Sequence, residues 1–157
     1  MCGIVGLFLK NPDLEPYLGK QLAPMLIGMS NRGPDSAGFA IYRNPVENGS
    51  IKLTLQHPNT DFDWPDVERK LSEELGVMVT SEVRSSHAVL VVGAPLEIVR
   101  RWIRLNHPEL RIVGMGENIE LFKEKGLPTD VAKRFKLEEF AGSHAVGHTR
   151  MATESAI

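Results

Sequence analysis

The chain has 157 residues, of which 18 are Lys or Arg and 20 are Asp or Glu, giving a formal net charge of −2 at pH 7. This balance offers no general attraction to nucleic acid or to an anionic membrane, and the 42% of hydrophobic residues is ordinary for a globular protein. The single cysteine, Cys2, excludes an internal disulfide framework and a cysteine-rich metal cluster. The start of the chain lacks the cationic residues and the cleavage site of a secretory signal, so we expect a cytoplasmic protein.

Residues 1–45 predict a strand, a helix, a loop and a second strand, in that order. An apolar run at 4–9 is typical of a strand that is covered on both faces. Leucines and methionines at three- and four-residue spacing over 14–29 predict an amphipathic helix. We expect a kink or a break in it at Pro24, because proline lacks the N–H that an inner helical position uses. Loop signals at 31–35 precede a strand at 37–42.

Residues from about 59 to 125 predict a small α+β subdomain inserted between two outer segments. Asp63 is suited to cap a helix that has Pro65 in its first turn and ends at Gly76. A second helix is expected at 95–105, and strands are expected at 77–83, 87–92, 110–115 and 118–122. This order of helix, two strands, helix and two strands is typical of an α+β layer.

The last zone predicts a short helix followed by a polar strand. Thr129 is suited to cap a helix that runs to Lys136, and residues 143–153 alternate enough to form a strand. The sequence then stops at Ile157 without a helix cap or a charged tail, so we expect a fragment of a longer protein.

Cys2 is the first candidate for chemistry. Residue two can become the N-terminus when the initiator methionine is removed, and one residue would then carry both a thiol and a free α-amine. An α-amine can accept the proton of a thiol near neutral pH, so such a nucleophile needs no histidine partner. A buried, inert cysteine at the start of a strand is the alternative that the position alone leaves open.

Three further patterns give this hypothesis its context. They are Met-Cys-Gly-Ile-Val-Gly at 1–6, Arg-Gly-Pro-Asp-Ser-Ala-Gly at 32–38 and Gly-His-Thr-Arg-Met-Ala-Thr at 147–153. Together and in this order they resemble the motifs of class II glutamine amidotransferases, which are N-terminal-nucleophile hydrolases. The resemblance implies an α+β fold, the four-layer αββα sandwich of those hydrolases, which is incomplete in this chain and carries the inserted subdomain.

The resemblance also implies a glutaminase reaction. The thiolate of Cys2 would attack the side-chain amide of glutamine, form a γ-glutamyl thioester and release ammonia for a synthase partner. Arg150 matches the residue that grips the α-carboxylate of glutamine, a role for which the parallel N–H groups of a guanidinium are well suited. Met151, which stands where many members of the family have tryptophan, and Thr153 match residues of the same pocket.

Five more residues match supporting positions of the family motifs. Arg32 and Asp35 match loop residues that support the nucleophile strand, and Ser36 follows them in the same motif. Gly33 permits a tight turn or a close approach of backbone. His148 is interpreted as a structural, hydrogen-bonding histidine, because the mechanism needs no second base.

The run Met-Ala-Thr-Glu-Ser at 151–155 is closest to stand-alone amidotransferase subunits of the glutamate synthase and N-methylglutamate synthase type. In that group the ammonia acceptor is made on separate subunits that carry flavin and iron–sulfur centres. The resemblance therefore implies glutamine as substrate and such a subunit as partner. We expect no cofactor and no metal in this chain, because one cysteine cannot ligate a cluster and the five histidines lack metal-ligand spacing.

The oxyanion hole of the family lies downstream of the arginine motif, beyond Ile157. Because the loss of one oxyanion donor costs about 10²–10³ in rate, we expect the chain alone to be inactive. Two other functions stay open, namely a hydrolase of another amide and a non-catalytic, glutamine-sensing or regulatory module with the same fold. Arg150 argues against the first, because it suits an amino-acid carboxylate, and exchange of Cys2 for alanine would separate sensing from catalysis.

Overall fold

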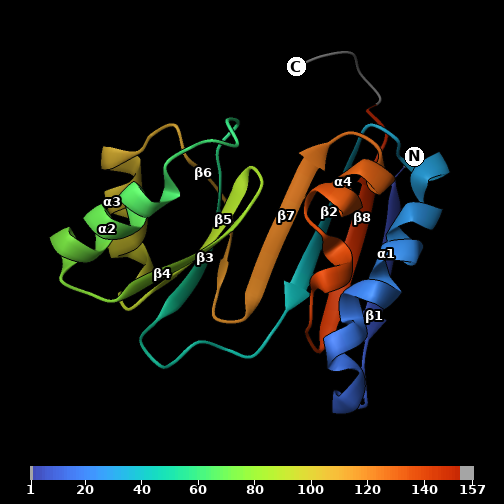
Figure 1. Ribbon diagram of the computed structural model, residues 1–157, viewed down its shortest axis with the longest axis horizontal. Helices are drawn as coiled ribbons and strands as arrows, with labels where there is room; N and C mark the ends of the chain where they lie inside the picture. Colours follow the sequence, from blue (N-terminus) through green and yellow to red (C-terminus); the bar gives the residue numbers. More distant parts are fainter. Residues whose placement is uncertain (1, 153–157) are drawn as a thin grey trace. The chain divides into compact units, whose positions relative to one another are not determined.

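The fold comes from a computed structural model, which describes residues 2–152. In this part of the chain the structure is mixed α+β, with two antiparallel four-stranded sheets and four α-helices (Figure 1). The chain divides into two compact units: Asn44–Glu120, which we call the inserted unit, and the segments before and after it, which we call the outer unit. None of the helices within the described range is long and apolar enough to cross a membrane.

The sheet of the outer unit has the strand order β1-β8-β2-β7. The strands are β1 at Gly3–Phe8, β2 at Ser36–Tyr42, β7 at Ile119–Lys125 and β8 at His144–Arg150. β8 is antiparallel to both β1 and β2, so the last of these strands in the sequence lies between the first two. All three sequence motifs are therefore brought into neighbouring strands.

Helices cover one face of this sheet. α1 (Leu18–Gly28) packs on β1 and β8, and α4 (Pro128–Arg134) packs on β2. Three short 3₁₀ turns flank these helices. η1 (Pro12–Tyr17) precedes α1, η2 (Ser30–Arg32) follows α1, and η3 (Leu137–Glu139) follows α4. The core between the layers is aromatic, since the ring of Phe39 lies 5.3 Å from that of Phe122 and 5.4 Å from that of Phe140.

Two expectations about these helices are corrected. The helix expected at 14–29 is a 3₁₀ turn, η1, followed by α1, and α1 continues through Pro24 without a break. Pro24 is exposed, so water can satisfy the carbonyl that the missing N–H leaves without a donor. Thr129 does not cap α4, because the capping position is Leu127 and no side chain bonds there.

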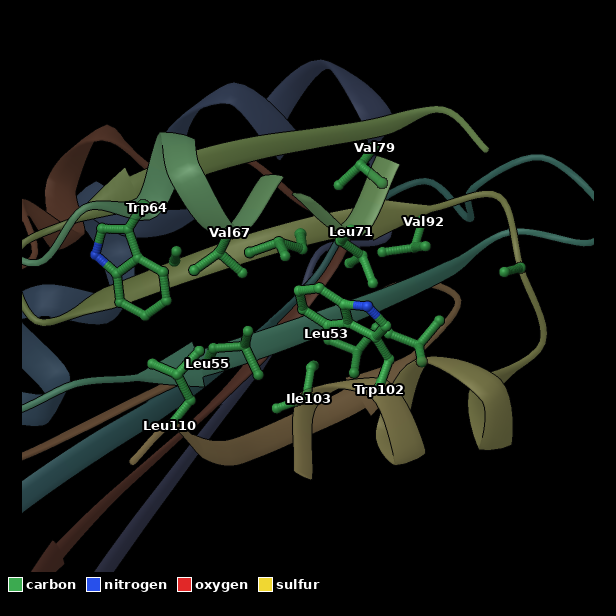
Figure 2. Close-up of a cluster of buried hydrophobic side chains, with 14 residues drawn as sticks. Leu53, Leu55, Trp64, Val67, Leu71, Val79, Val92, Trp102, Ile103 and Leu110 are labelled. Carbon is green, nitrogen blue, oxygen red and sulfur yellow. The ribbon is translucent and has the colours of Figure 1, made fainter. Parts of the chain in front are cut away.

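The inserted unit has the βαββαβ order of the ferredoxin-like motif. Its elements are β3 (Ile51–Gln56), α2 (Trp64–Leu75), β4 (Val79–Arg84), β5 (His87–Val92), α3 (Leu96–Asn106) and β6 (Arg111–Gly116). The sheet order is β4-β5-β3-β6. Figure 2 shows side chains of both helices, Trp64 and Val67 from α2 and Trp102 and Ile103 from α3, packed together with Leu53 in one apolar core.

The unit therefore starts earlier and ends slightly earlier than the expected range of about 59–125. β3 precedes that range, and its residues Lys52 and Thr54 are buried although they are polar. The ammonium of Lys52 is matched by the carboxylate of Glu120 at 3.0 Å, a pairing that the sequence does not indicate. The cap of α2 is as expected, since the Asp63 side chain accepts a hydrogen bond from the Asp66 N–H at 3.1 Å.

Candidate functional site

The three motifs meet at one end of the outer sheet. Gly3 of β1 pairs with Thr149 of β8, and Ser36 of β2 pairs with Arg150. If the β1 register is continued by one residue, Cys2 lies opposite Arg150. Because side chains alternate between the two faces of a sheet, Cys2, Arg150 and Ser36 share one face across three neighbouring strands.

That face is the one that the helices leave uncovered. Ile4, two residues after Cys2, is 70% exposed, Phe8 is 66% exposed and Val146 is 42% exposed, whereas Thr149, on the other face, is completely buried. We call this the open face; it comprises Cys2, Ile4, Phe8, Ser36, Val146, His148 and Arg150. At its far end from Cys2, the ring of His144 stacks on Tyr42 at 4.1 Å.

The two groups that carry the proposed chemistry are both accessible on the open face. Cys2 is a free, exposed cysteine, which contradicts the alternative of a buried thiol. Arg150 is exposed and forms no ion pair with any residue that the structure describes. The alternative of a surface salt bridge is therefore not realised within residues 2–152.

The loop before β2 holds the end of β8 that carries Arg150. A Cβ atom on Gly33 would lie 2.4 Å from the Arg150 nitrogen, so only glycine allows this approach. Pro34 forms an isolated parallel bridge with Arg150. The Asp35 N–H donates to the Arg150 carbonyl at 3.1 Å, and its Oδ2 accepts from the Ala152 N–H at 2.6 Å. The loop thus fixes the arginine strand directly.

The start of β1, next to Cys2, is fixed by close packing against Thr149, Met29 and Arg32. A Cβ atom on Gly3 would lie 2.9 Å from Thr149 Oγ1 and 3.0 Å from Met29 Sδ. Thr149 Oγ1 in turn donates to the Met29 carbonyl at 3.3 Å. The Arg32 Cβ atom would be 3.3 Å from the same added atom, so Arg32 also lies against the start of β1. Strand alternation over 144–150 is the signal that places Thr149 on the inner face.

The remaining expected site residues have less defined surroundings. His148 lies on the open face opposite Ile4 and Gly38, and its ring makes no hydrogen bond to another residue of the described range, so its structural role stays a prediction. Met151 follows Arg150 and is 37% exposed, while Thr153 lies outside the described residues. No group of three or more His, Cys, Asp or Glu in residues 2–152 is arranged to hold a metal ion.

Two proteins with assigned names are similar to the whole chain. The glutamine amidotransferase-like protein GlxB of Rhizobium meliloti (strain 1021) is 51% identical over 158 residues, which cover 100% of this chain and 52% of that protein. A putative glutamine amidotransferase of Methanothermobacter thermautotrophicus is 29% identical over 169 residues, covering 100% of this chain and 54% of that protein. No family model matches the chain. The chain spans about half the length of these relatives, and their names support a relationship with the glutamine amidotransferases.

Proposed function

We propose that the chain forms the nucleophile-bearing part of a class II glutamine amidotransferase. The observation that carries the proposal is the juxtaposition, at one end of the open face, of the exposed thiol of Cys2 with the exposed guanidinium of Arg150, which forms no ion pair within residues 2–152. The similarity to two proteins named as glutamine amidotransferases, or as like them, gives independent support for the same substrate.

In the proposed reaction, removal of Met1 frees the α-amine of Cys2, which takes the thiol proton. The sulfur then bonds to the side-chain amide carbon of glutamine. The C–N bond breaks, the nitrogen leaves as ammonia with the transferred proton, and a γ-glutamyl thioester remains. Water hydrolyses the thioester to glutamate and restores the thiol. No oxidant, reductant or metal enters this balance.

Arg150 has the role of orienting the substrate. A guanidinium can donate two parallel N–H bonds to a carboxylate, which fixes the direction of the chain that follows it. Arg150 is held by the Gly33–Asp35 loop and shares its face with Cys2, so a bound α-carboxylate would lie within the same surface as the thiol. Met151 and Thr153 are proposed to line the same pocket.

The proposal includes the αββα sandwich of N-terminal-nucleophile hydrolases. A sheet with one helix-covered face and one exposed apolar face needs a further layer, because Ile4 and Phe8 would otherwise remain in water. We propose that a second sheet covers the open face around Cys2 and supplies the oxyanion donors. We also propose that the ammonia goes to a synthase subunit with flavin and iron–sulfur centres, as the sequence resemblance implies.

Selective alkylation of Cys2 tests the proposal without requiring turnover. The probe is a diazoketone analogue of glutamine, and iodoacetamide serves as a thiol reagent without a carboxylate anchor. We expect the glutamine analogue to alkylate Cys2. In an Arg150→Ala variant we expect the rate of this alkylation to fall at least tenfold, while the rate of alkylation by iodoacetamide is unchanged. Equal loss with both reagents, or no dependence on Arg150, would contradict the assignment of Arg150.

A Cys2→Ala variant separates catalysis from sensing. If the protein is a glutaminase, the natural full-length protein is expected to release ammonia from glutamine, and the Cys2→Ala variant is expected to release none. The same variant is expected to bind glutamine still, as measured by calorimetry. If the wild-type protein binds glutamine but releases no ammonia, the sensing alternative is favoured instead. Hydrolysis of a different amide without glutamine binding would favour the third hypothesis.

A further inference from the structure

The segment that joins β2 to β3 contains an asparagine followed directly by a glycine, Asn48-Gly49. These two exposed residues form the tip of a turn, which is closed by a hydrogen bond from the Ser50 N–H to the Glu47 carbonyl at 3.0 Å. Gly49 has a φ of +86°, a left-handed value that favours glycine. Apart from its two neighbours in the chain, no residue has an atom within 4 Å of the position that a Cβ on Gly49 would take. The tip is therefore uncrowded and open to solvent.

Two groups at this tip can react with each other, the side-chain amide of Asn48 and the backbone nitrogen of Gly49. Neither of them forms a hydrogen bond with another residue that the structure describes. The nitrogen and the side-chain carbonyl carbon are close in the covalent chain, so closure of a ring between them requires only rotation about the bonds of Asn48. Glycine has no Cβ that would hinder this approach.

We propose that Asn48 is a site of spontaneous deamidation. The Gly49 nitrogen bonds to the side-chain carbonyl carbon of Asn48, and the bond from that carbon to the amide nitrogen breaks. Ammonia leaves with the proton that the Gly49 nitrogen gives up, and a five-membered succinimide ring remains. Water then opens the ring at one of its two carbonyls and leaves an aspartate or an isoaspartate at position 48. Water is the only co-reactant, nothing is oxidised or reduced, and no group of the open face takes part.

Four other asparagines are followed by a residue that blocks or hinders the same attack. Asn11 and Asn44 precede prolines, which have no N–H proton to give up. Asn118 precedes a β-branched isoleucine at the start of β7, and Asn59 precedes a β-branched threonine, so that a branched side chain crowds the nitrogen in both cases. The Asn59 side chain is also held, because its Oδ1 accepts from the Asp61 N–H at 3.0 Å.

At the two remaining asparagines the attacking nitrogen is held by a backbone hydrogen bond. The N–H of the residue that follows Asn31 donates to the Met29 carbonyl at 2.9 Å. The N–H of the residue that follows Asn106 donates to the Ile103 carbonyl at 2.8 Å. Ring closure at either position would first have to break this bond. Asn48 is thus distinguished both by its glycine neighbour and by the freedom of the two reacting groups.

The reaction would change the surface of the inserted unit without disturbing its core. It replaces a neutral amide by a carboxylate next to Glu47, and in the isoaspartate it lengthens the main chain by one methylene group. The turn is held beside its tip, where the Val46 N–H donates to the Glu117 carbonyl at 3.0 Å and β3 begins at Ile51. Neither residue of the tip belongs to the apolar core of the unit. We therefore expect the modified protein to keep its fold.

Peptide mapping by mass spectrometry tests the proposal on the natural full-length protein. The protein is incubated in mildly alkaline buffer made with water that is enriched in a heavy oxygen isotope. We expect the amide of Asn48 to be converted to a carboxylate that carries the heavy oxygen, with aspartate and isoaspartate both present among the products. The peptide that contains Asn59 serves as the internal control and is expected to remain unconverted.

Three variants test the assigned groups, and circular dichroism checks that each is folded. Asn48→Gln keeps an amide but would need a six-membered ring, and Gly49→Ala adds a Cβ beside the attacking nitrogen, so each is expected to slow conversion by about tenfold or more. Ser50→Ala keeps the reacting pair and should convert at the wild-type rate. The proposal would be overturned by an unconverted wild type, by a product without isoaspartate, by equal conversion at Asn59, or by a wild-type rate in Asn48→Gln.

Discussion

Gly33 shows how strictly one residue controls the arginine strand. Its φ of −167° is ordinary extended backbone, so the constraint is steric: a Cβ atom would lie 2.4 Å from the Arg150 nitrogen and 2.6 Å from the Thr149 carbonyl carbon. We expect Gly33→Ala to destabilise the protein by about 1–3 kcal/mol, because the crowded backbone must shift. Gly28→Ala is the control, since nothing lies within 4 Å of its added atom. Urea denaturation of both variants is the measurement, and equal midpoints would contradict this account.

Asp35 is expected to hold the residues that follow Arg150. Its Oδ2 accepts from the Ala152 N–H at 2.6 Å, and a hydrogen bond to a charged group is worth about 1.5–3 kcal/mol. Asp35→Ala should therefore speed amide hydrogen exchange at Ala152 by about tenfold to a hundredfold. Asp13→Ala, an exposed aspartate of η1, should leave that rate unchanged. Unchanged exchange in Asp35→Ala would show that the backbone pairing alone holds this segment.

The sequence motifs locate the exposed half of the candidate site better than its buried half. Cys2 and Arg150 are recognisable because their side chains carry reactive groups at characteristic positions. Thr149 and Gly3 lie in the same motifs, but they act through close packing, which depends on the pairing of β1 with β8 and which their residue types do not indicate. Asp35 is recognised by its motif, but its bond to Ala152 depends on the path of the loop.

Among the elements, α2 carries a charge network that should respond to pH. The Asp66 carboxylate lies 2.7 Å from Lys70 Nζ and 2.6 Å from an Arg69 nitrogen. The hydrogen bond from Lys70, followed by that from Arg69, lowers the pKa of Asp66 below its usual value. A pKa lowered by folding contributes stability above the unfolded-state value, and that contribution disappears as the pH falls through the folded-state value.

An NMR titration of the Asp66 carboxyl carbon tests this network. We expect Lys70→Met to raise the pKa of Asp66 toward its usual value, because the largest contribution to the shift is removed. Arg69→Met should raise the pKa of Asp66 by less, since the hydrogen bond from Arg69 lowers this pKa less than the hydrogen bond from Lys70 does. A pKa that does not move in either variant would mean that these exposed side chains do not hold the pairings in solution.

The sequence places an element well when its apolar residues form one clear pattern, either a continuous run or a stripe at helical spacing. The buried run of β5 is found at residues 87–92, as predicted, and α3 is found within one residue of its predicted bounds. β3 is missed because Lys52 and Thr54 alternate with its leucines while being buried themselves. Polar residues in alternation favour a solvated face, and the burial of Lys52 depends on its pairing with Glu120, which lies 68 residues away in the sequence.

At the scale of the whole molecule, the topology explains how the chain accommodates an insertion. The inserted unit begins at Asn44, after β2, and ends at Glu120, within β7. β2 and β7 are neighbours in the outer sheet, so the chain leaves and re-enters the outer unit at adjacent strands. An insertion whose ends lie close together leaves the pairing of its host intact. The two strands that flank the insertion can thus pair with each other in the outer sheet.

Because each unit has its own apolar core, we expect the two units to unfold separately. The chain has two tryptophans, Trp64 and Trp102, and both lie in the core of the inserted unit, where they are 2% and 6% exposed. Tryptophan fluorescence should therefore follow the inserted unit alone, while far-ultraviolet circular dichroism follows both units. In urea, we expect the two signals to give different midpoints.

Matched leucine truncations make this prediction specific. Leu22 in the outer unit and Leu71 in the inserted unit are both fully buried, and Leu→Ala at such positions costs about 2–5 kcal/mol. Leu71→Ala should shift the fluorescence transition to a lower urea concentration. Leu22→Ala should leave the fluorescence transition in place and should shift only that part of the circular dichroism transition that reports the outer unit. If both variants move both signals equally, the units unfold as one cooperative body, and the interactions joining them are as strong as those within each core.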